Sequence, residues 1–575
     1  MIMKKQIKGA IRYIKVAVLS VLTVVSLISC QKDENYDVIV YGATPAGIMA
    51  AVTAADQGAS VLLLEPTKVI GGMYSSGLNT AESEHMLNDV ITGRARDFYI
   101  RLGEEYYDSA YFTTFGNGRG LKWSEGDPAF FFESKHATAL FNDMVGEAGI
   151  DLIREVHLIA ADKAGTEIRS IQLSNGQTFQ GKYFVDCSYE GDLMAEAGVS
   201  YTYGRESIEA YNESLAGVRL IDDTLNGRTV GENGELLKSF NRYDTIIPGR
   251  GDKRVMNYNF RPLMSQDPDN MVPVTRPDQY DSTQFDFLAD YLAEHPKTRL
   301  GNLVGKYPRG SGKFEFNNQQ KSLISLGMFG ANTGYTEGDQ DTREEIYNDH
   351  KQWTLGFLYF LGHDPRVPEH LRKETRSYGF AADEFTNNEN FPVYLYVREG
   401  RRMIGALVQT QHDVYRDREK EDAVMLGSHW IDSHHVQRIA INDTSFVNEG
   451  RIWEMVVKPF EISYQTQVPK KDECTNLIVP VCSSFSHVGF CAYRLESTWM
   501  QAGHVAGVAA AMALKNDLAV QDVNITTLQN TLISEGMVID NDAITEFDDY
   551  RDIANREKFE RFTRMYSEYG LDMEM

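Results

Sequence analysis

The first clear hydrophobic pattern of the chain predicts a strand, a helix and a second strand in close succession. Residues 37–41 carry an apolar run of the length and composition typical of a buried parallel strand. Residues 48–57 are rich in alanine and predict a helix that ends at Gly58. Residues 60–64 form a second apolar strand. The order predicts a βαβ unit.

The turn inside this unit carries a pattern typical of dinucleotide binding. Gly42 permits the tight turn, and Gly47 lets the helix and strand pack closely. Amides at the start of the helix attract a pyrophosphate. Glu65 follows Gly47 by 18 residues (65 − 47) and would accept hydrogen bonds from ribose hydroxyls. Because Thr44 stands where the common pattern has its middle glycine, the pyrophosphate is expected slightly further out or on the Thr44 hydroxyl.

A second glycine pair follows Glu65. Residues 71–78, beginning Gly71-Gly72-Met73, resemble the segment that FAD-binding proteins of the glutathione-reductase-like superfamily carry after the ribose acid. Nothing comparable is expected at this point of an NAD domain. The cofactor implied by the resemblance is FAD.

The chain then continues the same domain with alternating helix and strand patterns. An Asn-Gly dipeptide at 175–176 between two alternating runs is a strong hairpin signal. The predicted helices cover 88–107 and 133–149, and the predicted strand-forming stretches cover 150–161, 167–173 and 177–182.

Residues 183–193 resemble the strand and turn in which the superfamily brings the chain back under the FAD pyrophosphate. This resemblance implies contacts from Asp186, Gly191 and Asp192, and an adenine contact near Val156 or Leu158. The alternative is an ordinary strand-to-helix turn whose acids cap the next helix.

Residues 206–445 lack the βαβ rhythm and predict an inserted domain. Strand-like pieces such as 254–263 and helices near 284–294 and 342–361 alternate with Pro-containing loops. Arg401 and Arg402 are predicted either to clamp a substrate or to form a salt-bridged face.

Three histidines within seven residues, His429, His434 and His435, raise the question of a metal site. They lack a matching acid cluster in the sequence, so we expect no metal.

The dinucleotide fold is expected to resume after the insertion. Residues 460–468 return to it, 476–481 predict a buried strand, and 499–515 predict a helix capped by Ser497 or Thr498. Its start, aimed at the pyrimidine edge of a flavin, would stabilise negative charge there. Residues 526–536 predict one more helix.

The predicted fold class is α/β, with a discontinuous Rossmann-like FAD-binding domain and an inserted mixed α+β substrate domain. The expected divisions are a lipoprotein signal peptide (1–29), an anchor linker (30–35), a first FAD-binding segment (36–205), a substrate or cap domain (206–445), a second FAD-binding segment (446–520) and a C-terminal helical tail (521–575).

The first 29 residues predict export. Five basic residues precede an apolar run over 16–28, which is too short to span a bilayer. Residues 27–30 resemble a bacterial lipobox, so Cys30 is expected to carry the lipid. The following 31–34 resemble an export tag of Gram-negative surface lipoproteins. The expected location is the outer membrane, facing the periplasm or the cell surface, with the lipid as the only membrane contact.

Charge and cysteine content exclude several classes of function. The chain has 57 basic and 82 acidic residues and a net charge of −25, which argues against a nucleic-acid partner. The four cysteines after Cys30 form no C-x-x-C pair, which argues against an iron–sulfur cluster or structural zinc. Whether they form disulfides is left open. They are Cys187, Cys474, Cys482 and Cys491.

The combined segments resemble the bacterial FAD-dependent oxidoreductase family, sometimes labelled xanthan lyase, over nearly all of the mature chain. Residues 487–498 are also remotely similar to fumarate reductases, succinate dehydrogenases and L-aspartate oxidases, in which a histidine faces the substrate and the segment after an Arg-Leu pair supplies amides to the flavin. The family segments are 42–51, 71–78, 186–199, 394–403, 428–435 and 483–507.

The resulting hypothesis is an extracytoplasmic flavoenzyme that exchanges a hydride between flavin N5 and a small polar substrate, with a sugar or glycoside hydroxyl as the expected class. The electron acceptor or donor is unknown. Alternatives are a fumarate-reductase-like ene reductase and a surface binding lipoprotein with a degenerate flavin fold. The predicted catalytic residues are His487, Arg401 and Arg402. The predicted FAD contacts are Gly42, Ala43, Thr44, Pro45, Ala46, Gly47, Glu65, Gly71, Gly72, Met73, Ser76, Gly77, Val156, Asp186, Gly191, Asp192, Arg494, Leu495, Glu496 and Ser497.

Overall fold

The computed structural model describes most of the chain after the predicted signal segment. The described residues are 35–82, 90–107, 126–219, 224–237, 240–242, 246–310, 312–319, 322–416, 418–454, 456 and 458–541. The predicted signal peptide, the predicted lipidation site Cys30 and the charged end of the tail lie outside them. Among the described residues, no helix combines the length and apolarity needed to cross a bilayer.

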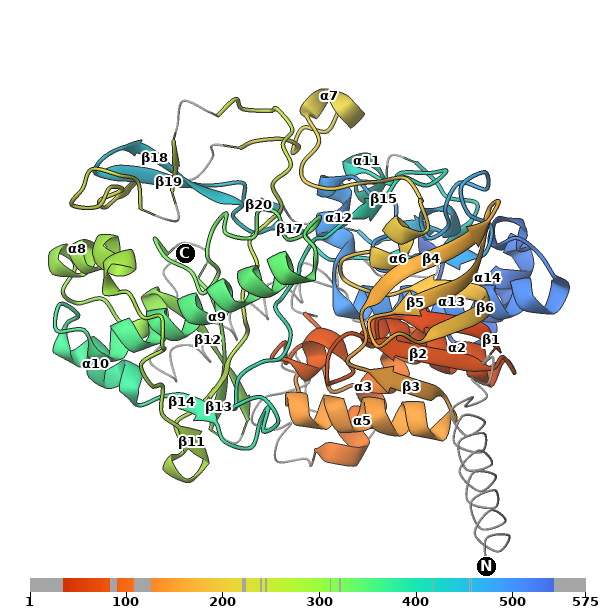
Figure 1. Ribbon diagram of the computed structural model, residues 1–575, viewed down its shortest axis with the longest axis horizontal. Helices are drawn as coiled ribbons and strands as arrows, with labels where there is room; N and C mark the ends of the chain where they lie inside the picture. Colours follow the sequence, from red (N-terminus) through yellow and green to blue (C-terminus); the bar gives the residue numbers. More distant parts are fainter. Residues whose placement is uncertain are drawn as a thin grey trace, which may run out of the picture.

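The predicted βαβ unit is confirmed at the centre of a seven-stranded sheet (Figure 1). Strand β1 (Asn35–Tyr41) pairs in parallel with β2 (Val61–Glu65), and helix α2 (Pro45–Asp56) connects them. The strand order is β3-β2-β1-β6-β5-β4, and β22 (Leu477–Ile478) also pairs with β6. The other strands are β3 (Asp151–Arg154), β4 (Leu158–Ala164), β5 (Glu167–Leu173) and β6 (Thr178–Asp186).

The hairpin predicted at Asn175-Gly176 is confirmed, because β5 and β6 pair antiparallel on either side of it. The single strand-forming stretch predicted over 150–161 is instead two strands. The chain turns at Glu155, whose φ is +59°, so that β3 joins the parallel half of the sheet and β4 the antiparallel half.

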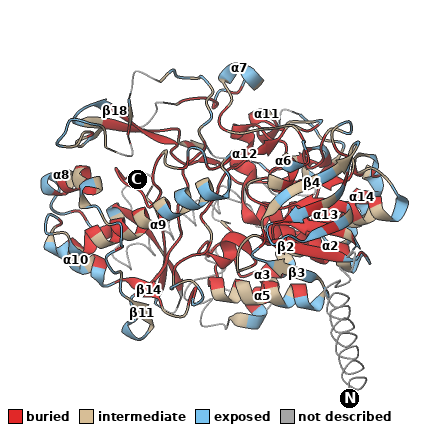
Figure 2. Cartoon of the chain, viewed as in Figure 1, coloured by how far each residue is buried: buried red, intermediate tan, exposed pale blue. Residues whose placement is uncertain are grey.

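Helix α13 (Glu496–Asn516) packs closely against α2, and both are buried over most of their length (Figure 2). The crossing depends on glycine. A Cβ on Gly503 would lie 2.1 Å from the Ala46 carbonyl oxygen, and one on Gly507 would lie 2.6 Å from that of Ala50. The helix begins at Glu496 with Leu495 as N-cap, so the prediction that Ser497 or Thr498 caps it is wrong. Also near the sheet are α3 (Gly93–Tyr106), α5 (Ser134–Glu147), α6 (Asp192–Glu196), α12 (His487–Tyr493) and α14 (Ile525–Ser534).

The middle of the chain builds separate sheets, on the left in Figure 1. A five-stranded sheet has the order β11-β14-β10-β13-β12, and the long helix α9 (Gln340–His363) packs against α10 (Glu369–Arg376). The strand-like piece predicted over 254–263 is not a strand, since β10 covers only Leu263–Ser265. The others are β11 (Met271–Val272), β12 (Val304–Gly310), β13 (Lys313–Asn318), β14 (Gly379–Ala381) and α8 (Asp286–Glu294).

Smaller sheets complete the region between the insertion and α13. Strand β16 (Ala423–Gly427) pairs with β21 (Phe460–Ser463), and β16 contacts α13 and α14. Strands β17 (Ile431–Ser433) and β20 (Ile452–Glu454) pair, and so do β18 (Gln437–Asn442) and β19 (Ser445–Glu449). The division of the chain into the predicted domains stays a prediction.

Candidate active site

The predicted nucleotide residues meet at one cavity. Its volume is about 190 Å³, and it lies at the carboxyl ends of the central parallel strands β1 and β2. Four predicted FAD contacts line it: Gly42, Thr44, Glu65 and Asp192. These residues come from three separate segments of the chain. Their convergence on one cavity is the arrangement expected around the ADP half of FAD.

Glu65 lies at the end of β2 and is fully buried. Its carboxylate accepts hydrogen bonds from the amides of Ala43 (2.9 Å) and Thr67 (2.7 Å) and from the hydroxyl of Tyr394. Burial raises the pKa of Glu65 to about 7, and these hydrogen bonds act in the opposite direction. Val156, the predicted adenine contact, is buried beside it and donates its amide to the Glu65 carbonyl.

The glycine turn is as tight as the sequence predicts. A Cβ on Gly47 would lie 1.9 Å from the Gly42 carbonyl oxygen, and Gly42 itself has a φ of +93°. The Thr44 hydroxyl caps α2 by accepting from the Gly47 amide and donates to the Cys187 carbonyl. Thr44 therefore closes the turn with its own side chain, and Pro45 and Ala46 form the first turn of the helix.

The second glycine pair is also sterically required. Gly71 and Gly72 both have positive φ, and a Cβ on Gly72 would lie 2.1 Å from the Tyr189 hydroxyl. That hydroxyl accepts from the Met73 amide (3.0 Å) and donates to Glu496. Ser76 accepts from the Tyr394 amide, and Gly77 packs on the backbone of Arg261.

The acid in the turn after β6, Asp186, finds its hydrogen-bond partners within the turn and the helix that follows. Asp186 is buried and accepts hydrogen bonds from Ser188 and from the Met194 amide. This is the geometry of the alternative in which the acid caps the next helix. Gly191 is the N-cap of that helix, α6, with a φ of +71°. Asp192 lines the cavity and forms an ion pair with Arg343 and with Arg401.

The first turns of α13 present buried polar atoms without protein partners. Four side-chain atoms have no hydrogen-bond partner: Glu496 Oε2, Thr498 Oγ1, Trp499 Nε1 and Gln501 Nε2. Burial raises the pKa of Glu496 to about 8. Buried polar groups are costly when unpaired, so a polar ligand or solvent is expected here. Since the glycine segment at 71–77 touches the same helix through Tyr189, this place fits the flavin half of the cofactor.

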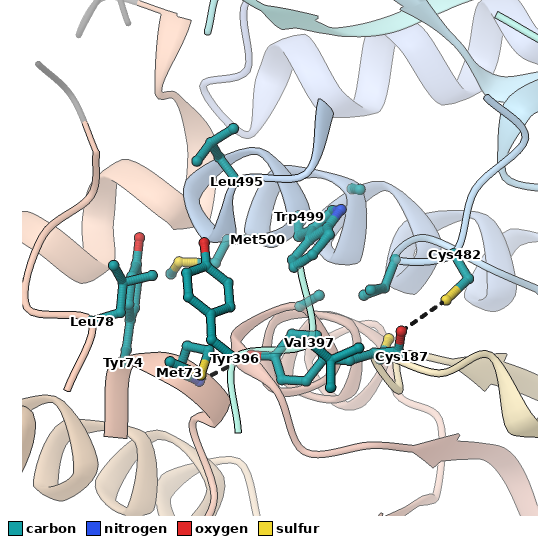
Figure 3. Packing of buried hydrophobic residues seen from close by; sticks show 14 of the residues in the cluster. Met73, Tyr74, Leu78, Cys187, Tyr396, Val397, Cys482, Leu495, Trp499 and Met500 are labelled. Carbon is teal, nitrogen blue, oxygen red and sulfur yellow. Dashed lines mark hydrogen bonds between the residues drawn. The ribbon is translucent and has the colours of Figure 1, made fainter. Parts of the chain in front are cut away.

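Next to these two segments lies a cluster of arginines, of which the sequence singled out only Arg494, as a predicted FAD contact. The ring of Tyr396 is drawn in Figure 3 among Met73, Tyr74, Leu78, Leu495 and Met500, and all belong to one buried cluster. Three guanidinium groups meet this ring. Arg398 lies 4.4 Å and Arg261 5.9 Å from its centroid, and Arg494 lies 3.5 Å from its hydroxyl.

The electrostatics of this arginine cluster (Arg261, Arg398 and Arg494) are unusual. Burial, together with the other two guanidinium groups, lowers the pKa of Arg398 to about 9. Burial and the same three arginines lower the pKa of His434, which is therefore a neutral imidazole. Asp432 accepts from Arg494 (3.0 Å), yet burial raises the pKa of its carboxyl.

His487 begins α12 and is buried beside the cluster. Its Nδ1 lies 2.9 Å from both carboxylate oxygens of Glu399, and its Nε2 lies 4.0 Å from the Cys491 sulfur. Burial favours the neutral ring, but the Glu399 carboxylate and Cys491 outweigh it and raise the pKa of His487 to about 10. The imidazole is therefore protonated at neutral pH.

The two predicted arginines are held by acids. Arg401 forms ion pairs with Asp192 (2.8 Å) and Glu337 (2.7 Å). Arg402 is fully buried and pairs with Glu206 and Glu399. These contacts match the predicted alternative of a salt-bridged face. Glu399, which pairs with Arg402, also contacts and positions His487. Arg402 thus acts on the site through its neighbours.

Two other groups of side chains could in principle bind a metal or form disulfides. Glu133, Asp383 and Glu384 lie close enough together to hold a cation, but the Lys313 ammonium donates to all three. The four cysteines whose pairing the sequence left open are free thiols and buried.

A family model described as "FAD dependent oxidoreductase" matches residues 37–532. A stretch of 53 residues is 47% identical to an NADH:fumarate oxidoreductase of Klebsiella pneumoniae (strain 342); it covers 9% of this chain and only 6% of that protein.

Solved structures give weaker likenesses. OxyS anhydrotetracycline hydroxylase from Streptomyces rimosus is 14% identical, with 49% of this chain and 44% of that chain covered and a TM-score of 0.25. The aromatic hydroxylase CabE is 13% identical, with 49% and 43% covered and a TM-score of 0.26. At these scores they add nothing to the argument. The match over residues 37–532 is informative, because it contains both glycine segments, Glu65 and helix α13. The chain belongs to the FAD dependent oxidoreductase family.

Proposed function

We propose that this FAD-dependent oxidoreductase works outside the cytoplasm and transfers a hydride between flavin N5 and a small polar organic molecule, with a sugar or glycoside hydroxyl as the leading class. The observation that carries the proposal is the position of the arginine cluster. The cluster adjoins both predicted flavin segments, because Arg494 immediately precedes the N-cap of α13 and the backbone of Arg261 packs on Gly77. A buried polar site beside a flavin segment is where a polar substrate would react.

The chain's own residues supply the binding of FAD. Glu65 would accept from the ribose, the first amides of α2 would face the pyrophosphate, and Val156 would contact the adenine. The first turn of α13 would face the pyrimidine edge of the flavin. When bound, FAD accepts or donates a hydride at N5.

Two side chains are suited to proton transfer, one as a donor and the other as an acceptor. His487, protonated at neutral pH by its Glu399 partner, is suited to donate a proton or to hold negative charge on a substrate oxygen. Asp432 has a carboxyl of raised pKa and one oxygen without a partner, which suits it to accept a hydroxyl proton. Oxidation of an alcohol would use Asp432, and reduction of a substrate would use His487.

Replacement of His487 tests the proton role. His487→Gln is expected to retain FAD and to lower the rate of flavin reoxidation by an oxidised substrate about 10²- to 10⁴-fold, as for loss of a general acid. The rate is followed by stopped-flow absorbance. His363→Gln, at the exposed end of α9, is the matched control. An unchanged rate in both variants would remove His487 from the mechanism.

A second candidate is an ene reductase of the fumarate-reductase kind, favoured by the short match to the Klebsiella protein. It would need an external electron donor. Anaerobic titration separates the candidates: bleaching of the flavin by sugars supports the first, whereas reoxidation of viologen-reduced flavin by fumarate supports the second.

The proposed location rests on the N-terminal sequence, with Cys30 as the lipid carrier and the outer membrane as the destination. Cys30→Ser is expected to abolish incorporation of labelled palmitate and to release the protein from the membrane fraction. Labelling that persists in this variant would contradict the anchor.

A further inference from the structure

Glu496 is a buried acid at the start of α13, and only one of its two carboxyl oxygens has a partner. Its Oε1 accepts a hydrogen bond from the Tyr189 hydroxyl, whereas its Oε2 has no hydrogen-bond partner. The Tyr189 oxygen itself accepts from the Met73 amide (3.0 Å), so the single hydroxyl hydrogen is directed to Glu496. A proton carried by Glu496 therefore resides on Oε2, the free oxygen.

The surroundings of Glu496 favour the neutral acid. The titratable groups that interact with it from neighbouring segments are Tyr74, Tyr99, Tyr189 and Glu82. No lysine, arginine or histidine in the described part of the chain forms an ion pair with it. Burial raises the pKa of Glu496 to about 8; the hydrogen bond from Tyr189 acts against this, and the charge of Glu82 adds to it. At neutral pH the free oxygen thus carries a hydrogen that it can donate.

Other polar atoms of the same helix turns also lack partners. They are Thr498 Oγ1, Trp499 Nε1 and Gln501 Nε2, and all are buried. The Trp499 ring lies 5.7 Å from the Tyr189 ring, and Figure 3 draws Trp499 in the same buried cluster as Met73. Buried donors without acceptors indicate a ligand that carries acceptors. The carbonyl oxygens at the pyrimidine edge of a flavin are such acceptors.

We propose that Glu496 binds the flavin as a neutral carboxylic acid, with Oε2 donating its hydrogen to a carbonyl oxygen of the pyrimidine edge while Oε1 stays bound to Tyr189. The inference deepens the proposed function and rests on it for the placement of the flavin beside α13. Because only the protonated acid can donate, FAD binds together with a proton. Loss of that proton would place a negative charge against the carbonyl oxygen and weaken the binding of FAD.

The test is the Kd of FAD for the full chain, measured by quenching of flavin fluorescence at pH 7 and pH 9.5. The wild-type Kd is expected to rise about 10- to 30-fold across this window, because the protonated fraction of an acid with a pKa of about 8 falls by about that factor. Glu496→Gln keeps an acceptor for Tyr189 and a donor for the flavin at every pH. Its Kd should match the wild type at pH 7 and change far less at pH 9.5.

The ratio of the wild-type Kd to that of Glu496→Gln isolates the acid of interest. Both proteins retain Glu65, whose pKa of about 7 also affects FAD binding, and its contribution cancels in the ratio. Glu104→Gln, an exposed change on α3, should follow the wild type at both pH values. A ratio that stays the same between pH 7 and pH 9.5 would overturn the inference. A ratio that falls would also overturn it, because an ionised Glu496 would then accept from the flavin N–H.

A measurement on the wild type alone decides if Glu496→Gln does not fold. Calorimetric titration with FAD at pH 8.5, in two buffers of different ionisation enthalpy, counts the protons taken up on binding. Uptake of most of one proton supports the inference, since Glu65 is already ionised in the free protein at this pH. Release of protons, or no uptake, would refute it.

The inference and the proposed function fail separately. Flavin that binds together with this proton, but that no substrate reduces or reoxidises, would refute hydride transfer and leave the role of Glu496 standing. Flavin that a sugar reduces, in a protein whose Kd ratio does not depend on pH, would leave hydride transfer standing and refute the role of Glu496.

Discussion

Replacing Gly47 by alanine is expected to cost the protein its FAD. The new Cβ would lie 1.9 Å from the Gly42 carbonyl oxygen and 3.1 Å from the Cys187 Cβ. Because the nearest atom belongs to the backbone of the glycine turn, the turn itself must move, at a cost of about 1–3 kcal/mol or more. A distortion of that size weakens a ligand about 10- to 100-fold. We expect purified Gly47→Ala to be largely colourless, with a raised Kd for FAD measured by quenching of flavin fluorescence.

The matched control is Gly146→Ala, also in a helix. A Cβ at Gly146 meets nothing within 4 Å, and alanine favours a helix by up to about 1 kcal/mol over glycine. This variant should bind FAD as the wild type does and unfold at the same or a slightly higher temperature. If Gly47→Ala bound FAD normally, the glycine turn would not be the pyrophosphate site.

The nucleotide half of the site could be predicted from the sequence because its components lie close together in the chain. Gly42, Gly47 and Glu65 fall within one βαβ unit, where the helix and strand periods fix their relative positions. Gly42 and Glu65 line one cavity, as the local pattern alone leads one to expect.

The substrate half could not be predicted in this way. Arg261, Arg398, Asp432 and Arg494 come from four distant segments, and only the tertiary fold brings them together. One signal was present: Tyr394, Tyr396 and Arg398 alternate with apolar residues, as in an extended segment with one functional face. The adjacent Arg401 and Arg402 were conspicuous, but they serve ion pairs.

Two of the wrong predictions of local structure have their causes in the residues concerned. The sequence predicts a cap at Ser497 or Thr498 because these residue types favour caps, yet burial of the first turn places the helix start at Glu496. The stretch 150–161 is continuous in pattern, and the left-handed turn at Glu155, a residue type that rarely adopts it, has no signal in the sequence.

Replacing Glu399 by glutamine is expected to give the largest loss of stability among single charge-neutralising changes near the site. Glu399 is fully buried between His487 and Arg402, so its removal leaves two buried cations with one carboxylate fewer. Breaking a buried pair in this way costs about 3–5 kcal/mol. The loss is measured as the change in the free energy of urea-induced unfolding at pH 7.

The pH dependence of unfolding tests whether the stability lost in Glu399→Gln comes from the pairing with His487. Its folded-state pKa of about 10 lies above the ordinary 6.5, so its contribution to stability is complete below pH 6.5 and is lost as the pH rises through 10. The wild type should therefore lose unfolding free energy across this window, and Glu399→Gln should lose much less. Its deficit against the wild type should shrink between pH 7 and pH 10. Glu104→Gln, an exposed change on α3, should follow the wild type throughout. A deficit that is the same at both ends of the window would mean that Glu399 supports Arg402 alone and leaves the proton of His487 to another partner.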